Sequence, residues 1–153
     1  KIKRVNILGT DISSSMLRYA SKGVYSAPLL DRGMSESRKK YHFDSQSGGW
    51  AVKEKIRSMV KFREANLLLS YGMLGKFDII FCRNVLIYFS DEVKKDILNR
   101  MAAALKPGGY LILGSTESMA SSIDVFDMIR LGGCLVYKSK SERSTMDNIF
   151  ARR

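Results

Sequence analysis

Apolar and polar positions along the chain form a recurring pattern, in which short apolar runs are followed by polar residues and then by amphipathic stretches. The clearest run, Ile-Ile-Phe-Cys at residues 79–82, is continuous and ends abruptly at the polar pair Arg83-Asn84. A continuous apolar run of this length is typical of a parallel strand covered on both faces. Ligands bind at the carboxyl ends of strands in open α/β sheets, so the polar pair predicts either a ligand site or a solvated strand end.

An amphipathic helix is predicted directly after this strand. Apolar residues recur at helical spacing from Val93 to Leu105, and Ser90 or Asp91 is suited to cap the helix. The run Lys-Pro-Gly-Gly at 106–109 predicts the end of the helix, and Tyr-Leu-Ile-Leu at 110–113 predicts a second strand. A strand–helix–strand unit of this kind is nearly always parallel and right-handed.

A second polar strand end is predicted near the start of the chain. An apolar strand at 5–9 leads into Thr10-Asp11-Ile12, and a helix is expected to begin at Ser13 to Ser15 and to end at Gly23. By itself, Asp11 fits best as a helix N-terminal acid, which the helix dipole favours. Together with the strand end at Arg83-Asn84, it favours a carboxylate that accepts hydrogen bonds from ribose hydroxyls.

The α/β pattern is interrupted over about residues 24–62. The Gly- and Ser-rich residues 45–49 predict a hairpin turn, and we expect a small inserted antiparallel β-subdomain. His42 is expected to be a surface hairpin residue rather than a catalytic base, and Trp50 to be a packing residue. The short runs that predict its strands are 41–43, 50–53 and 59–62.

The fold class that these patterns predict is α/β with a parallel core. A carboxyl-terminal hairpin near 124–130 and 134–138 should follow the core, with Gly132-Gly133 in its turn. The core strands are expected near 5–9, 60–65, 77–82 and 109–114.

Charge narrows the class of partner. The net charge is +11, and nine basic residues but only three acidic ones lie between Arg32 and Arg63. Such a balance suits either nucleic acid or an acidic protein, but no nucleic-acid-binding motif accompanies it. An acidic protein partner explains the charge as well, and without such a motif we do not expect nucleic acid. A single histidine, with no carboxylate–histidine cluster, argues against a metal site.

Composition is that of one globular domain. Its 153 residues are 45% hydrophobic, and no run approaches the roughly 20 apolar residues that cross a bilayer. Both cysteines, Cys82 and Cys134, occupy apolar strand contexts and are expected to be reduced, buried thiols. Reduced thiols fit a cytoplasmic protein, and we expect a monomer without a transmembrane segment.

With these elements in place, the chain resembles the catalytic domain of the bacterial chemotaxis receptor methyltransferases, the CheR-type protein-glutamate O-methyltransferases. The resemblance extends to about Lys138. The segment Phe81 to Phe89 is very specific, whereas the Lys-Pro-Gly-Gly turn is shared by many methyltransferases. The matching segments are Ile7 to Ile12, Lys22 to Tyr25, Val60 to Leu68, Phe77 to Phe89, Leu105 to Tyr110 and Gly114 to Ser118.

The resemblance implies a partial Rossmann-like fold that binds S-adenosylmethionine (SAM) and transfers its methyl group to glutamate side chains of chemotaxis receptors, whose methyl-accepting helices are acidic. Arg83 would orient a carboxylate, and Tyr88 would direct its hydroxyl to the transfer site, unless it is a core aromatic. Asn66 alone would also fit a simple turn. The cofactor-binding residues implied are Asp11 and Ile12 at the ribose, Asn66 and Leu67 at the adenine, and Arg83 and Asn84 at the methyl-donor end.

One departure from the family pattern concerns the start of the chain. Family members have an amino-terminal helical domain, a first strand and a glycine-rich turn, whereas this chain begins at what would be the second strand. We therefore expect residues 1–138 to form a catalytic domain truncated at its amino terminus, followed by a polar, basic tail at 139–153. The alternative function is a receptor-docking module that does not turn over.

Overall fold

The computed structural model describes residues 5–115, 117 and 124–140, and the chain divides into two compact units, residues 1–66 and 67–153. Both units combine helices and strands. Their elements are β1 (Ile7–Asp11), α1 (Ser14–Lys22), β2 (Val24–Tyr25), α2 (Ala27–Asp31), α3 (Glu36–His42), β3 (Phe43–Gln46), β4 (Gly49–Val52), α4 (Glu54–Arg57) and β5 (Val60–Glu64) in the first, and η1 (Gly72–Leu74), β6 (Phe77–Cys82), η2 (Leu86–Tyr88), α5 (Asp91–Ala104), β7 (Leu105–Leu113), β8 (Phe126–Leu131) and β9 (Cys134–Ser139) in the second.

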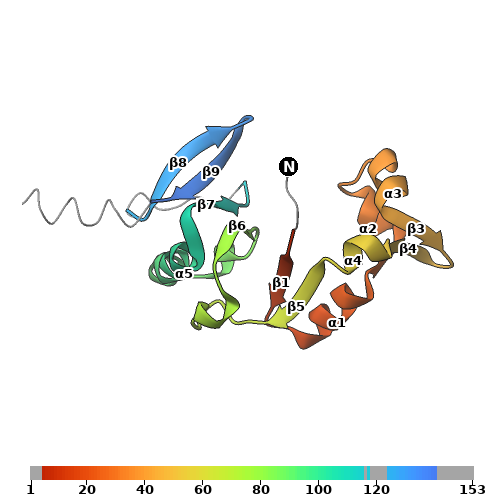
Figure 1. Ribbon diagram of the computed structural model, residues 1–153, viewed down its shortest axis with the longest axis horizontal. Coiled ribbons are helices and arrows are strands. Elements are labelled where there is room, and N and C mark those ends of the chain that lie inside the picture. Colours follow the sequence, from red (N-terminus) through yellow and green to blue (C-terminus); the bar gives the residue numbers. More distant parts are fainter. Residues whose placement is uncertain (1–4, 116, 118–123, 141–153) are drawn as a thin grey trace, which may run out of the picture. The chain divides into compact units, whose positions relative to one another are not determined.

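The first unit is built on the parallel pair β1–β5, which runs in register from Ile7–Val60 to Asp11–Glu64. Helix α1 follows β1, as the cap signals predict (Figure 1). The Ser13 hydroxyl accepts a hydrogen bond from the Met16 N–H, and Gly23 ends the helix with a φ of 64°, a conformation that glycine adopts without steric cost. The expected strands near 5–9 and 60–65 are confirmed.

The inserted subdomain is confirmed, with β4 at the expected place. Of the expected strand 41–43, however, only Phe43 lies in a strand, and the expected strand 59–62 does not belong to this sheet. Its sheet has the order β2–β4–β3 and is antiparallel throughout. Tyr41 and His42 belong to helix α3, because Ser35 caps that helix by accepting a hydrogen bond from the Arg38 N–H. His42 therefore ends a helix rather than occupying a hairpin. The third strand is β2, since residues 60–62 pair with β1 instead.

A buried lysine organises this subdomain. Lys39 is 5% exposed, and its ammonium forms ion pairs with Asp31, at 2.7 Å, and with Glu36. The same ammonium lies 5.0 Å from the centre of the Trp50 ring, a cation–π contact. The hydrogen bonds to Asp31 and then to Glu36 raise the pKa of Lys39. The expectation that Trp50 packs is thus consistent with its contact to Lys39.

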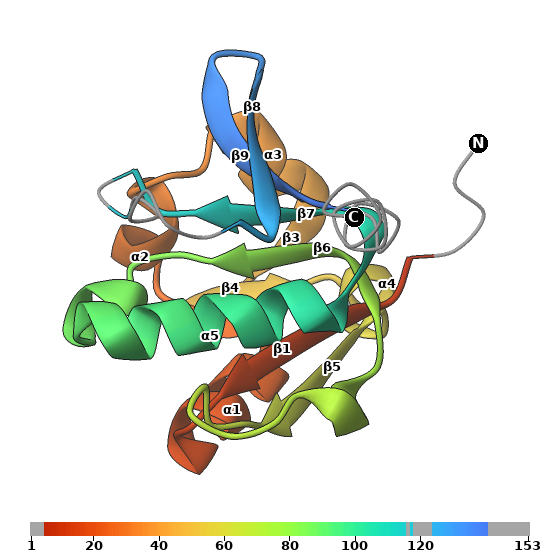
Figure 2. The same ribbon diagram turned by 90° about the vertical axis from the view of Figure 1, so that its left-hand side faces the viewer.

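The second unit has a four-stranded sheet of order β6–β7–β9–β8, in which β6 and β7 are neighbouring parallel strands as expected. Figure 2 shows α5 running alongside this sheet, and Ile97, Leu98 and Met101 pack from the helix against Leu111 and its neighbours. β7 starts at Leu105, directly after the helix, so the Lys-Pro-Gly-Gly run lies inside β7, where the register with β6 shifts.

The expectation that β6 is covered on both faces is wrong for this unit. Ile80 and Cys82 face α5 and pack into the core, whereas Ile79 and Phe81, on the opposite face, are 49% and 70% exposed. The reason is that α5 packs on one face of the strand only, and no other described element of the second unit covers the other face.

The carboxyl-terminal hairpin β8–β9 is confirmed, and its turn contains Gly132 and Gly133, which both have positive φ angles. β9 pairs antiparallel with β7. Cys134 is exposed at the start of β9, so the expectation of two buried thiols holds for Cys82 but is wrong for Cys134. In the part of the chain that the structure describes, no helix is both long and apolar enough to span a membrane.

Replacing Leu111 by alanine should lower the free energy of unfolding by roughly 2–5 kcal/mol, because Leu111 is 0% exposed and its loss leaves a cavity. Urea denaturation followed by circular dichroism measures this change. Ile79→Ala is the control, since its side chain is half exposed on the opposite face and should cost less than about 1 kcal/mol. Equal losses in the two variants would contradict the one-sided core.

Candidate functional site

The carboxyl end of β6 has an unusual backbone. Among the described residues other than glycine, only Asn84 has a positive φ, at 59°. Asparagine is one of the few residue types that tolerate the left-handed region. The turn lies directly after Arg83 and before the short helix η2. The turn therefore places two polar side chains, Arg83 and Asn84, at the carboxyl end of β6, the edge where open α/β sheets bind ligands.

A single carboxylate holds this turn. Glu117 Oε1 accepts hydrogen bonds from the backbone N–H groups of Val85, at 2.8 Å, and Leu86, at 2.7 Å. Glu117 Oε2 accepts from the N–H groups of Asn84, at 2.7 Å, and Gly114, at 2.8 Å. Both oxygens are thus used twice, and the carboxylate joins the ends of β6 and β7.

The electrostatics of Glu117 follow from these donors. The side chain is 8% exposed, and burial by itself raises the pKa of a carboxyl group. The four N–H donors outweigh burial and hold the pKa of Glu117 below its ordinary value. Nearby, burial and then the Glu117 charge raise the pKa of Cys82 to about 11, so its thiol stays neutral at physiological pH.

Close approach at this site requires glycine at position 114. A Cβ atom built on Gly114 would lie 2.6 Å from Glu117 Oε2 and 2.8 Å from Asn84 Oδ1. Real Cβ atoms do not approach other atoms so closely, so any larger residue at position 114 displaces the carboxylate or the turn. The glycine directly after β7 is therefore part of the same arrangement.

The side chains predicted for the methyl-donor end are accessible. Arg83 and Asn84 are exposed, and Tyr88 is 80% exposed, so within the second unit Tyr88 is not a core aromatic. The buried residue of η2 is Leu86, at 3%. The structure therefore anchors the segment through Leu86 and Glu117 and leaves the polar groups of Arg83, Asn84 and Tyr88 free of the core.

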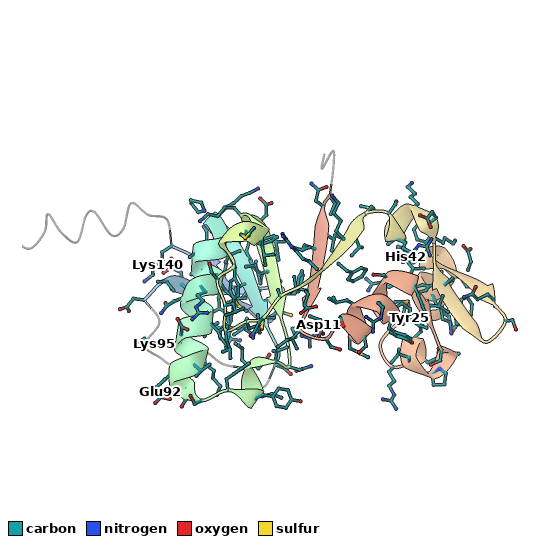
Figure 3. All side chains as sticks on the ribbon, turned by 90° about the horizontal axis from the view of Figure 1, so that it is seen from below. Asp11, Tyr25, His42, Glu92, Lys95 and Lys140 are labelled. Carbon is teal, nitrogen blue, oxygen red and sulfur yellow. The ribbon has the colours of Figure 1, made fainter. Side chains whose placement is uncertain are left out.

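The other predicted ligand residues lie at the carboxyl end of the β1–β5 pair, in the first unit. Asp11 is the last residue of β1, next to the start of α1 (Figure 3), and its Oδ1 accepts a hydrogen bond from the Ser13 N–H at 2.7 Å. The Ala65 N–H donates to the Asp11 carbonyl at 3.0 Å, which brings the neighbouring Asn66 to the same end. Ile12 is exposed beside Asp11.

Leu67 belongs to a loop that the second unit holds at two points. The Tyr71 hydroxyl donates to the Leu67 carbonyl at 2.6 Å, and the Arg100 guanidinium of α5 donates to the Leu68 carbonyl. Arg100 is itself paired with Asp96. Burial raises the pKa of Tyr71 to about 12, which keeps this hydroxyl protonated and able to donate.

Sequence reasoning thus placed Arg83 and Asn84 at the end of β6, and Asp11 and Asn66 at the end of the β1–β5 pair. It did not identify Glu117, Tyr71 or Arg100 as residues that hold these segments. Glu117 falls within the segment Gly114 to Ser118 that carries the resemblance, but it lies more than 30 residues from three of its four donors. No local pattern could have assigned it to them.

Comparison with known proteins gives a consistent result. Residues 1–134 match the family described as "CheR methyltransferase, SAM binding domain". The chain is 50% identical over 137 residues to Chemotaxis protein methyltransferase 1 of Vibrio cholerae and to Chemotaxis protein methyltransferase 1 of Pseudomonas aeruginosa; each match covers 89% of this chain and 50% of the relative. The chain therefore spans about half the length of the curated relatives that it matches.

Among solved structures, one of a magnesium protoporphyrin IX methyltransferase from Synechocystis PCC 6803 with bound SAM was compared with this chain. The alignment covers 89% of this chain and 60% of the methyltransferase chain. The TM-score is 0.45 and the identity 17%, a similarity too low to support a conclusion.

The low pKa of Glu117 can be measured through the amide resonances of the residues that donate hydrogen bonds to it. We expect the amide resonances of Asn84, Val85, Leu86 and Gly114 to shift together as the pH falls, with a midpoint below 4.5, the ordinary value for glutamate. Because the pKa in the folded state is the lower one, the carboxylate stabilises the fold fully above its unfolded pKa, and this contribution disappears as the pH falls through the folded pKa.

A ¹H–¹⁵N correlation spectrum recorded across the acid range makes this measurement. The amide of Gly133, in the exposed hairpin turn, serves as the control and should not follow the same curve. A common midpoint at or above 4.5, or four unrelated midpoints, would contradict the arrangement around Glu117.

Proposed function

The chain belongs to the CheR methyltransferase family through its SAM-binding domain, and from this premise we propose that it carries the methyl-transfer site of a cytoplasmic protein-glutamate O-methyltransferase that acts on chemotaxis receptors. The observation that best supports the proposal is the Arg83-Asn84 turn. It combines a cationic and an amide side chain at the carboxyl end of a parallel strand, on a backbone that Glu117 holds in place.

The residues at the strand ends fit SAM chemically. In the proposal, the exposed Asp11 carboxylate accepts hydrogen bonds from the ribose hydroxyls, with Ile12 beside it. Asn66 offers an amide to the adenine, and Leu67 offers an apolar surface. Arg83 and Asn84 serve the methyl-donor end. Bound SAM supplies an electrophilic methyl group on a sulfonium centre.

The chemistry asks little of general acid–base catalysis. A receptor glutamate, with a pKa of about 4.3, is already ionised at neutral pH, so its oxygen can attack without a base. The task of the protein is then to align the carboxylate with the methyl group. We assign this task to Arg83, whose planar guanidinium suits a carboxylate, with the exposed hydroxyl of Tyr88 at the same site.

The basic subdomain is proposed as the docking surface for the acidic receptor helices. Arg38 and Lys40 are exposed on α3 and can attract an acidic partner. Lys39, which lies between them, is buried against Asp31, Glu36 and Trp50 and is not available to a partner. On α3, the two basic residues that can contact a partner therefore flank one that stabilises the subdomain itself.

The role of Asp11 can be tested in an exchange enzyme, in which this chain replaces the region that it matches in the Vibrio cholerae relative. Asp11→Ala should weaken SAM binding about 10- to 100-fold, the range expected for lost hydrogen bonds to a charged group. Isothermal titration calorimetry measures the affinity. Asp44→Ala removes an exposed carboxylate from β3 of the same unit and should leave the affinity unchanged. An unchanged affinity in Asp11→Ala would remove Asp11 from the site.

Arg83 and the basic subdomain should affect different steps. In the exchange enzyme, Arg83→Ala should lower the methyl-transfer rate at least about tenfold while receptor binding changes little, because the guanidinium acts on the reacting carboxylate. Arg38→Glu with Lys40→Glu should instead weaken receptor binding, most strongly at low salt, with a near-normal rate at saturating receptor. The assay is incorporation of labelled methyl groups into receptor fragments across a salt series.

The same loss pattern in both variants would contradict this division of roles. A folded exchange enzyme that binds receptor and SAM but incorporates no methyl group would replace the enzyme proposal with the alternative of a receptor-docking module.

A further inference from the structure

We propose that Glu117 is the positioning residue of the methyl-transfer site: it fixes the backbone from which Arg83 and Asn84 project, and methyl transfer depends on it through those side chains. This inference rests on the proposed function. Glu117 does not need to touch SAM or the substrate, because both of its oxygens are already occupied by backbone N–H groups.

The first step of the argument is the position of the carboxylate in the sheet. The last paired residues of the parallel ladder are Cys82 and Leu113. Directly beyond them, Glu117 Oε2 accepts hydrogen bonds from the N–H groups of Asn84, which lies two residues past the end of β6, and Gly114, which lies one residue past the end of β7. Glu117 thus continues the link between β6 and β7 where backbone pairing stops, and fixes the direction in which the chain leaves β6.

The second step is the conformation that this link maintains. Asn84 has a φ of 59°, which is less favourable for a residue with a Cβ than the ordinary helical region. In this geometry, three successive N–H groups, from Asn84 to Leu86, converge on one carboxylate. The favourable charge-assisted bonds therefore offset the cost of the left-handed residue.

The third step is the consequence for neighbouring side chains. Arg83 and Asn84 are exposed and have no core packing that would orient them. The positions of both side chains consequently depend on the backbone beneath them, and a rotation of the peptide unit that joins the two residues changes how one lies relative to the other. Misplacement of a reacting group by about 1 Å can cost on the order of 100-fold in rate, so the link matters for the reaction as well as for the fold.

The informative variant is Glu117→Gln, which keeps the size of the side chain. A carboxamide has one oxygen and one NH₂ group, so whichever way it is placed, the NH₂ group faces two N–H donors. Two of the four bonds are therefore lost and the turn is released. Gly114→Ala is a second variant, whose added Cβ would displace the same carboxylate. Glu92→Gln, on an exposed acid of α5 (Figure 3), is the control.

The experiment is a double-mutant cycle on kcat/KM for methyl transfer in the exchange enzyme, with folding of every variant checked by circular dichroism. In the Arg83 background, Glu117→Gln should lower kcat/KM at least about tenfold, through kcat more than through the KM for SAM. In an Arg83→Ala background, the same change should lower it less than about threefold, because the side chain that it positions is gone. Glu92→Gln should have no effect in either background.

Equal losses in the two backgrounds would overturn the proposal, because they would mean that Glu117 acts independently of Arg83. A loss confined to stability, with kcat/KM unchanged in the folded fraction, would overturn it as well. Failure of the parent exchange enzyme to transfer methyl groups would count against the proposed function instead.

In that case, ¹⁵N relaxation of the parent and of Glu117→Gln decides the positioning role directly. Increased mobility at Arg83 and Asn84 in the variant, with α5 unchanged, supports the role of Glu117, and unchanged relaxation at both residues contradicts it.

Discussion

Backbone N–H groups that leave the end of a buried parallel sheet have no ladder partner, and burying them unpaired costs free energy. At the ends of β6 and β7, one carboxylate meets this constraint for four N–H groups at once. The left-handed turn at Asn84 and the glycine at position 114 belong to that arrangement. The Glu117 charge also adds to burial, which is the larger cause, in raising the pKa of Cys82. The backbone hydrogen bonds to Glu117 thus fix the framework of the candidate site, and the exposed side chains on that framework supply its chemistry.

The inserted subdomain also contains a buried charged group that needs partners, but here the group is a cation, the ammonium of Lys39. A buried ammonium is costly unless it is paired, and Lys39 is paired with two carboxylates and lies over an aromatic ring. Four residues of this small subdomain are thereby joined around one buried ammonium. Because Lys39 is used internally, the net positive charge of the segment overstates the charge that it presents to a partner.

The parts of the fold that the sequence predicted well are those with local signals. Ser13 and Gly23 mark the two ends of α1, and Gly132-Gly133 marks the hairpin turn, because caps and tight turns depend on a few adjacent residues. Asp11 and the Arg83-Asn84 pair were found for the same reason, as polar residues immediately after apolar strands. Their roles toward SAM remain predictions.

The parts that the sequence did not predict depend on distant partners. Tyr41 and His42 form an aromatic run that favours a strand, yet they continue a helix capped at Ser35. Glu117 receives three of its hydrogen bonds from residues more than 30 positions away, and Lys39 is buried although lysine is a typical surface residue. Periodicity reports which face a residue occupies, but it does not report which residue lies opposite.

The exposed face of β6 has a consequence for the behaviour of this chain in solution. β6 is the outer strand of the four-stranded sheet in the described residues, and Phe-Asp-Ile-Ile-Phe-Cys contains a single charge. An apolar outer strand with unpaired backbone groups is a template for strand addition between copies. The net charge of +11 keeps copies apart through repulsion that salt screens, so we expect added salt to favour this contact between copies.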